Sequence, residues 1–220
     1  MNKTVLGLLV SGRGSNLQAI MDAISAERLN AKIGLVISDN PEANALKRVA
    51  GFDILAISIE RGKFTTREQF EEAIAAQFTL HHVELVLLAG FMRILSPCFI
   101  NHFPGRIMNI HPALLPAFAG LDAQQQALDY GAKVSGCTVH FVDEGMDTGP
   151  IILQEAVPVL AGDTSKTLAE RILHVEHLLY PRAIGLYCEQ RLQVDGRRVK
   201  ILDKTAAARG AKNDLETSFN

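Results

Sequence analysis

Asn109 and His111 stand two residues apart in an apolar stretch, and Pro112 follows them directly. Successive side chains of an extended chain alternate between its two faces, so Asn109 and His111 can converge on one small volume. Pro112 favours that extended conformation, because it disfavours the α region for the residue before it. An amide donor beside a group that titrates near neutrality suits a reaction in which a carbonyl oxygen becomes negative and a proton moves. A buried His and Asn with satisfied hydrogen bonds at a strand end is the structural alternative.

A second group of candidates lies in the turn DEGMDTGP (143–150), which carries acids among glycines. Asp147 could orient His111 and favour its charged form, because a nearby carboxylate stabilises an imidazolium ion. The turn lacks the full pattern of a calcium loop, so a metal is not the favoured interpretation. The structural alternative is an acidic turn exposed to solvent.

The segment SGRGSN (11–16) joins an apolar run to a helical pattern and has the character of an anion-binding loop. Its glycines let the backbone approach a phosphate, whose oxygens the N–H groups at the helix start, with Ser15 and Asn16, can bind. Leu17 stands where a G-x-G-x-x-G motif has its third glycine, and the segment has no Walker lysine. The pattern favours a phosphomonoester over a dinucleotide, and a simple capped turn is the structural alternative.

Two further segments have the composition of a cleft wall. The segment AGFMRILSP (89–97) surrounds Arg93 with large apolar residues, and it could line a flat heteroaromatic pocket or plug the core. HPALLPAFAG (111–120) holds two prolines and directly follows the candidate His, so it could shape a cleft or be a connection packed on the core. His140, in the middle of an alternating strand pattern, is expected to be a structural residue. The same expectation holds for the helical His174 and His177.

The elements that must position these residues alternate along the first half of the chain. Strands are expected over 4–10, 31–38, 52–58, 84–90 and 106–111. Helical patterns fill the intervals: 17–29, 39–51 with Pro41 in its first turn, and 65–82 with Thr65 or Thr66 as its cap. This order predicts an α/β fold with a doubly wound, mostly parallel sheet, in which ligands bind beyond the carboxyl ends of the strands. The candidate motifs follow strand ends.

The second half changes character and predicts an antiparallel extension of the sheet. Strands over 135–145 and 150–159 are expected to pair around the acidic turn, after a helix over 121–132. A long helix over 164–190, bent near Pro181, precedes a hairpin that turns at Asp195-Gly196.

Length, charge and cysteine content limit the class of protein. The 220 residues suit one domain, and a formal net charge of -2 gives no reason to expect a nucleic acid or an anionic membrane as partner. The N-terminal apolar run is too short to span a bilayer. Cys98, Cys137 and Cys188 form no C-x-x-C pair, so we expect reduced thiols in the cytoplasm and no metal.

Four motifs in order, SGRGSN, NIHPALLPAF, GCTVHFVDEGMDTGPIILQ and RILHVEHLLYP, resemble those of the phosphoribosylglycinamide formyltransferase family. The resemblance runs from about Lys3 to Ile201. It implies one formyltransferase domain over 1–202 with a Rossmann-like fold. Residues 203–220 hold few large apolar residues, so we expect a flexible tail there. The resemblance also implies a reaction in purine biosynthesis, in which the formyl group of the cosubstrate 10-formyltetrahydrofolate is transferred to the amine of a glycinamide ribonucleotide. The amine would attack the formyl carbon directly.

The same resemblance implies roles for individual residues. Asn109 and His111 match the catalytic pair, and Asp147 the carboxylate that keeps the His charged. Residues matching the ribonucleotide site are Gly14, Ser15, Asn16, Leu173, His174, Val175 and Glu176. Arg67 would meet the glutamate tail of the folate. The other residues matching the folate site are Met92, Arg93, Ile94, Leu95, Asn109, Asp143, Glu144, Gly145, Met146 and Asp147.

The chain departs from the family in one segment, because Gly120 to Gln126 lacks the histidines that many relatives carry there. Three alternatives fit the sequence less well. A formyltetrahydrofolate hydrolase would lack SGRGSN and add an N-terminal regulatory domain, and methionyl-tRNA formyltransferase would need an appended RNA-binding domain. The third alternative is a non-catalytic folate- or nucleotide-binding module. Small-molecule substrates, and a monomer or weak homodimer, are expected.

Overall fold

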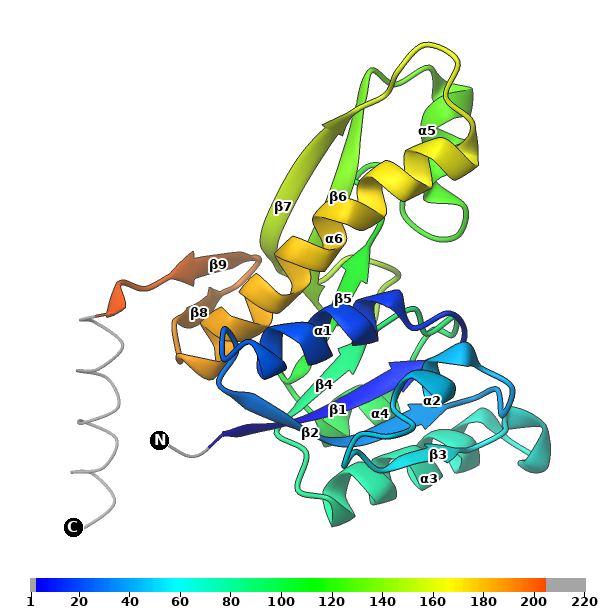
Figure 1. Ribbon diagram of the computed structural model, residues 1–220, viewed down its shortest axis with the longest axis vertical. Helices are drawn as coiled ribbons and strands as arrows, with labels where there is room; N and C mark the ends of the chain where they lie inside the picture. Colours follow the sequence, from blue (N-terminus) through cyan, green and yellow to red (C-terminus); the bar gives the residue numbers. More distant parts are fainter. Residues whose placement is uncertain (1–2, 205–220) are drawn as a thin grey trace.

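The computed structural model describes residues 3–204, whose strands form one nine-stranded sheet in the order β3-β2-β1-β4-β5-β6-β7-β9-β8 (Figure 1). The strands are β1 Thr4–Val10, β2 Ala31–Ser38, β3 Ala56–Ser58, β4 Leu85–Leu88, β5 Ile107–His111, β6 Val134–Phe141, β7 Ile151–Pro158, β8 Leu192–Asp195 and β9 Arg198–Ile201. The helices are α1 Ser15–Ser25, α2 Asn44–Arg48, α3 Arg67–Leu80, α4 Pro97–His102, α5 Ala123–Tyr130 and α6 Ser165–Cys188, with a 3-10 turn η1 Arg61–Lys63. Within 3–204, no helix is both long and apolar enough to cross a membrane.

Strand direction divides the sheet into two parts. The five strands from β3 to β5 run parallel, whereas β6 is antiparallel to β5 and β7 is antiparallel to β6. The hairpin of β8 and β9 joins β7 through one parallel pair, Ile151 with Arg198. The predicted mostly parallel sheet with an antiparallel C-terminal extension is confirmed, including the turn at Asp195-Gly196.

The sheet is covered on both faces, and residue alternation in β1 shows how. Leu6, Leu8 and Val10 pack with α1, α2 and α6 on one face, while Leu9 packs with α3 and α4 on the other (Figure 1). Successive strand residues point to opposite faces, so a strand that is buried on both sides must be continuously apolar. This requirement explains the unbroken apolar run of β1.

Tyr180 of α6 ties this helix to the middle of the sheet. Its side chain is fully buried, and its hydroxyl lies 2.9 Å from the carbonyl oxygen of Met108 and 3.1 Å from that of Leu88. A buried hydroxyl needs such a partner, because leaving it without a hydrogen bond costs free energy. The helix continues through Pro181.

The structure corrects several expected boundaries. The strand predicted over 52–58 is confined to β3, because Phe52 and Leu55 remain about half exposed and only three residues pair with the end of β2. The helix predicted over 39–51 is confined to α2. Pro41 lies in a turn before it, where the side chain of Asn40 accepts a hydrogen bond from the Glu42 N–H and delays the helix.

One helix was not predicted, and one expectation falls outside the described residues. Helix α4 begins after Ser96, whose hydroxyl accepts a hydrogen bond from the Phe99 N–H, with Pro97 at the first helical position. Ser followed by Pro is the local signal for such a start. The tail expected over 203–220 lies outside the described residues except for Asp203 and Lys204.

Thr66, rather than Thr65, caps α3, and this choice can be tested. The Thr66 hydroxyl accepts from the Gln69 N–H at 3.2 Å, and the Gln69 side chain accepts from the Thr66 N–H. We expect Thr66→Ala to lower the free energy of unfolding by about 1 kcal/mol, measured by urea denaturation. Thr65→Ala, the matched control, should change it by less than about 0.5 kcal/mol. Equal effects of the two substitutions would contradict the assignment.

Candidate active site

The pairing of β5 with β6 assembles the core of the site. Asn109 lies directly opposite His140, and His111 lies opposite Thr138. Residues opposite each other in an antiparallel pair point to the same face. The side chains of Asn109, His111 and His140 therefore share one face at the carboxyl end of β5, where the parallel part of the sheet ends.

Asp147 joins this group from the turn that follows β6. One of its oxygens, Oδ2, lies 3.3 Å from His111 Nδ1. The other, Oδ1, lies 3.5 Å from Asn109 Nδ2 and 3.7 Å from His140 Nε2, and these two nitrogens are 3.2 Å apart. The structure thus brings the three predicted catalytic residues together. It also adds His140, which the sequence had suggested to be purely structural.

His111 is enclosed between two oxygen acceptors. Its side chain is only 5% exposed, Nδ1 faces Asp147, and Nε2 lies 2.8 Å from the carbonyl oxygen of Phe118. A neutral imidazole carries one N–H and could donate to only one of these oxygens. Both oxygens would receive a hydrogen bond only if each ring nitrogen carried a proton.

Asp147 is held in its ionised form. Burial by itself raises the pKa of this carboxyl, but the His140 side chain, the Gly120 N–H and the charge of His111 together outweigh burial and hold the pKa below its ordinary value. The Gly120 N–H donates to Oδ2 at 2.9 Å. A carboxylate that accepts hydrogen bonds beside cationic groups loses its proton more readily. Asp147 consequently supplies a fixed negative charge at neutral pH.

The other two acids of the turn after β6 differ in their contacts, since Asp143 is hydrogen-bonded within the turn and Glu144 is exposed. Asp143 closes the turn, because its Oδ1 accepts from the Gly145 N–H at 3.2 Å and from the Thr148 hydroxyl at 2.6 Å. Glu144 is exposed, and Met146 is 50% exposed. Gly149 must be a glycine, since a Cβ there would overlap the carbonyl oxygen of Phe141. The closed turn directs Asp147 back toward β5.

Thr138 fixes the segment that leaves His111. Its buried hydroxyl donates to the Ala113 carbonyl oxygen at 2.7 Å and accepts from the Leu115 N–H at 3.0 Å. Gln154 of β7 donates to the same hydroxyl and to the Leu115 carbonyl oxygen. The beginning of the 111–120 segment is therefore tied to the sheet rather than free in solvent.

The loop after β1 presents a helix start without a side-chain cap. Gly14 has φ +70°, and a Cβ on it would lie 2.6 Å from the Ala45 Cβ, so a glycine is required. Helix α1 begins at Ser15, and Gly14 offers no side chain to its first N–H groups. Arg48, which donates through Nε to the Arg13 carbonyl oxygen at 2.7 Å, adds a cation that sequence reasoning missed. Free N–H groups and a nearby guanidinium suit an anion.

Asn16 and Glu176 form a buried pair between α1 and α6. The Asn16 amide donates to Glu176 Oε2 at 2.8 Å, whereas the buried Asn16 Oδ1 has no hydrogen-bond partner within 3–204. Burial raises the pKa of Glu176, and the Asn16 hydrogen bond opposes the change without cancelling it. In the preceding turn of α6, Leu173 and Val175 are half-buried and His174 is exposed.

The segment after β4 combines exposed apolar side chains with anchored cations. Met92 is 70% and Ile94 53% exposed, whereas Leu95 is buried in the core between the sheet and α3. Arg93 pairs with Asp39 at 2.6 Å. Arg67 pairs with Glu71 at 2.9 Å and donates to the Ile94 carbonyl oxygen. The Met92 N–H donates to the Ser11 hydroxyl at 3.1 Å, which links this segment to the loop after β1.

Cys137 is an unsuitable nucleophile although it lies near this region. Burial raises the pKa of its thiol to about 12, and the negative charges of Glu176 and Glu155 add to the effect. A thiol that stays protonated at neutral pH reacts poorly.

Comparison with known proteins decides the family. A family model described as "Formyl transferase" matches residues 5–184. The chain belongs to the formyl transferase family. Phosphoribosylglycinamide formyltransferase from Bacillus subtilis is 44% identical over 80% of this chain and 91% of its own length. A crystal structure of glycinamide ribonucleotide transformylase 1 from Symbiobacterium toebii is 49% identical, with a TM-score of 0.90 over 92% of this chain and 95% of that one.

Two other comparisons match this formyl transferase to a part of a longer protein. The trifunctional purine biosynthetic protein adenosine-3 of Chironomus tentans is 46% identical over 84% of this chain, but the chain spans only 14% of its length. A formyltetrahydrofolate deformylase from Pseudomonas syringae is 27% identical, with a TM-score of 0.85 over 91% of this chain and 66% of that one. The fold is therefore shared with a deformylase, at lower identity than with the transferases.

The buried Glu176 makes the stability of this formyl transferase depend on pH. Its pKa is higher in the folded protein than in the unfolded chain, so the folded state keeps a proton that the unfolded chain has already lost. The stability that Glu176 contributes is therefore fully present at pH values below its pKa in the unfolded chain. It is lost as pH rises through its pKa in the folded protein.

We expect Glu176→Gln, which still accepts from Asn16 but cannot ionise, to unfold at a higher temperature than the wild type at neutral and alkaline pH. The difference should shrink toward acid pH. Thermal unfolding followed over a pH series measures it. Glu170→Gln, an exposed acid on the same helix, is the control and should follow the wild type. A variant less stable than the wild type at every pH would contradict the raised pKa.

Proposed function

We propose that this formyl transferase moves the formyl group of 10-formyltetrahydrofolate to the amine of N1-(5-phospho-D-ribosyl)glycinamide in de novo purine biosynthesis. The observation that carries the proposal is the convergence of Asn109, His111 and Asp147 at the carboxyl end of β5. The names of the relatives from Bacillus subtilis and Symbiobacterium toebii support the choice of acceptor.

The ribonucleotide would bind between the loop after β1 and α6. The first N–H groups of α1, with Gly14 and Ser15, would hold its phosphate. Asn16 Oδ1, a buried acceptor without a partner within 3–204, would accept a hydrogen bond from the substrate. Glu176, with the side chains of the turn before it, would contact the glycinamide portion. This arrangement directs the amine toward the end of β5.

The folate would occupy the region between the segment after β4 and the acidic turn. The exposed Met92 and Ile94 provide apolar surface for a flat pteridine, and Met146 with its neighbours, Asp143 to Asp147, would close the pocket from the other side. Leu95 would support this wall from the core rather than touch the ligand. Arg67, at the start of α3, would meet the negatively charged glutamate tail.

The reaction would begin when the substrate amine attacks the formyl carbon and turns its carbonyl oxygen into an oxyanion. Asn109 Nδ2 and the charged His111 would stabilise that oxygen, and His111 would help pass a proton to the departing folate nitrogen. Asp147 would keep His111 charged and oriented. Since these groups supply the positive potential, the proposed reaction needs no metal.

His111 must exchange one partner before it can act in this way. Its Nε2–H points at the Phe118 carbonyl oxygen, and Asp147 occupies the other ring nitrogen. We therefore propose that the substrate oxygen replaces the Phe118 oxygen, which requires the chain around Phe118 to shift. The Phe118 contact would hold the imidazole in the orientation that the reaction uses.

The protein is proposed to act in the cytoplasm as a monomer or weak homodimer. Sedimentation of the purified chain over a range of concentrations tests the oligomeric state.

One assay tests the central proposal. The purified chain is mixed with 10-formyltetrahydrofolate and glycinamide ribonucleotide, and deformylated folate and formylated ribonucleotide are measured together. Equal amounts of both products support the transferase. Loss of the formyl group without the ribonucleotide would instead indicate a hydrolase, and binding of both ligands without turnover would indicate a non-catalytic module.

Asn109→Ala tests the oxyanion donor. Removing one such donor should lower kcat by roughly 10²–10³-fold while KM changes little, because the interaction forms mainly in the transition state. Steady-state kinetics with both substrates measures the effect. Asn101→Ala, an exposed asparagine on α4, is the control. A loss confined to KM would remove Asn109 from this role.

Asp147→Asn tests the fixed negative charge. The carboxylate lies 3.3 Å from His111 Nδ1 and would stabilise a cation there, so without its charge turnover should fall and the pH profile should move toward acid. The rate measured from acid to alkaline pH shows both effects. Asp53→Asn, an exposed loop acid, should leave rate and profile unchanged. If Asp147→Asn keeps the wild-type rate and pH dependence, Asp147 has no part in the mechanism.

A further inference from the structure

A group of three side chains outside the active site combines the donors of a transition-metal site. Glu72 of α3 meets Cys98 and His102 of α4, and one ligand atom from each residue lies within 4.8 Å of the others. All three residues are exposed. Cys98 and His102 are four residues apart, so they lie on the same side of α4.

We propose that Glu72, Cys98 and His102 bind a zinc ion. A thiolate, an imidazole and a carboxylate are the donors that zinc takes in proteins. Magnesium and calcium are disfavoured, because both prefer an all-oxygen set of ligands. Three protein ligands leave a fourth tetrahedral position, which water would fill.

The distances require only small side-chain movements. Ligand atoms around a tetrahedral zinc ion lie roughly 3.3–3.8 Å apart, as follows from bond lengths of about 2.0–2.3 Å. Atoms spread over as much as 4.8 Å would therefore approach one another, whereas a pair in direct contact would separate. His102 Nε2 and Glu72 Oε2 are 2.9 Å apart, and their side chains are 38% and 59% exposed. Exposed side chains can separate by this margin without disturbing the core. The zinc ion would lie between these two atoms and bind both of them, so their direct contact would be lost.

The backbones that carry the ligands are already fixed by buried neighbours. Glu71, next to Glu72, accepts hydrogen bonds from the Ser96 N–H at 3.1 Å and from the Ser96 hydroxyl at the start of α4. Phe99 of α4 packs with Phe103, the residue directly after this helix, and their ring centroids are 5.4 Å apart. Binding therefore has to order only three side chains, which limits the entropy that it costs.

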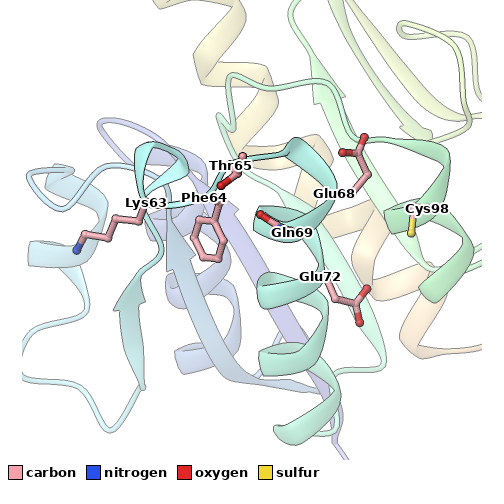
Figure 2. A pocket seen from close by; sticks show the side chains of 7 residues that line it. All are labelled: Lys63, Phe64, Thr65, Glu68, Gln69, Glu72 and Cys98. Atoms are coloured by element: carbon pink, nitrogen blue, oxygen red, sulfur yellow. The ribbon is translucent and has the colours of Figure 1, made fainter.

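The surroundings favour a cation and give it access. Glu72 and Cys98 line one side of an open hollow of ≈ 590 Å³, together with Glu68 one helical turn earlier (Figure 2). Lys63, at another part of its lining, is paired with Glu60 at 2.6 Å. The thiol therefore shares the lining of the hollow with two carboxylates, although the Arg106 guanidinium donates to the nearby His102 carbonyl oxygen at 3.1 Å, and the hollow lets an ion enter from solvent.

The proposed ion would join two helices outside the candidate active site. It would fasten α4 to α3 directly after the segment that contains Ile94, whose carbonyl oxygen already accepts from Arg67 of α3. No sequence motif pointed to a metal here, because Cys98 has no C-x-x-C partner. The ligands come together only when α4 packs on α3.

Cobalt(II) provides a direct test, because a thiolate ligand gives cobalt an absorption band in the near ultraviolet and tetrahedral geometry gives intense bands in the visible. We expect both when the metal-free, reduced full-length protein is titrated with cobalt(II), and we expect zinc to displace the cobalt. Cys98→Ser should abolish the thiolate band. His102→Ala and Glu72→Gln should weaken apparent affinity by more than about 10-fold.

Matched variants separate this site from adventitious binding. Cys188→Ser, which removes another thiol, and Glu68→Gln, which removes the neighbouring acid, should both keep the band. Zinc should raise the Tm of the wild type and leave that of Cys98→Ser unchanged, while formyl transfer stays the same in that variant. A wild type without the thiolate band, or a Cys98→Ser variant that retains it, would overturn the proposal.

Discussion

The register between β5 and β6 is the constraint on which the site depends. Asn109 faces His140 across this antiparallel pair, and His111 faces Thr138. A slip of one residue would turn Val139 to the site and send His140 into the core, because side chains alternate strictly along a strand. The register also sets where β6 ends, and hence where the turn that carries Asp147 begins. One pairing therefore positions the amide, both imidazoles and the carboxylate.

One partly buried and one buried carboxyl show how local donors decide charge. Asp147 and Glu176 both lose solvation, which raises the pKa of an acid. Asp147 receives the Gly120 N–H and lies beside two imidazoles, and its pKa ends below the ordinary value. Glu176 receives one amide from Asn16, and burial prevails. The same fold thus keeps one acid ionised and favours a proton on the other, a separation typical of sites that move protons.

The local sequence pattern was sufficient to predict most of the fold and part of the candidate site. The apolar runs of β1 and β2 marked buried strands, and the two-residue spacing of Asn109 and His111 predicted their convergence. His140 was missed because an alternating strand pattern does not say which residue it will face. The register that pairs it with Asn109 is a property of two strands that are distant in sequence.

The group of Glu72, Cys98 and His102 was missed for the same reason. Its members lie on two helices, and only the packing of α4 on α3 brings them together. The start of α4 did have a local signal, in Ser96 followed by Pro97. A short helix without a strong apolar period is easily taken for a loop, so the contact that it makes with α3 could not be anticipated.

The segment after His111 contacts both His111 and Asp147, so under the proposed function it would couple substrate entry to the hydrogen bonds of these two groups. Its first part is fixed by Thr138, which bonds to Ala113 and Leu115. Further along, the segment is held by the site itself, since Phe118 accepts from His111 and Gly120 donates to Asp147. Movement of this second part would free one N–H of His111 and one acceptor position on Asp147 together. A substrate that displaces the segment would therefore meet both groups with their hydrogen-bonding capacity newly available, and the same contacts would close the site again when product leaves.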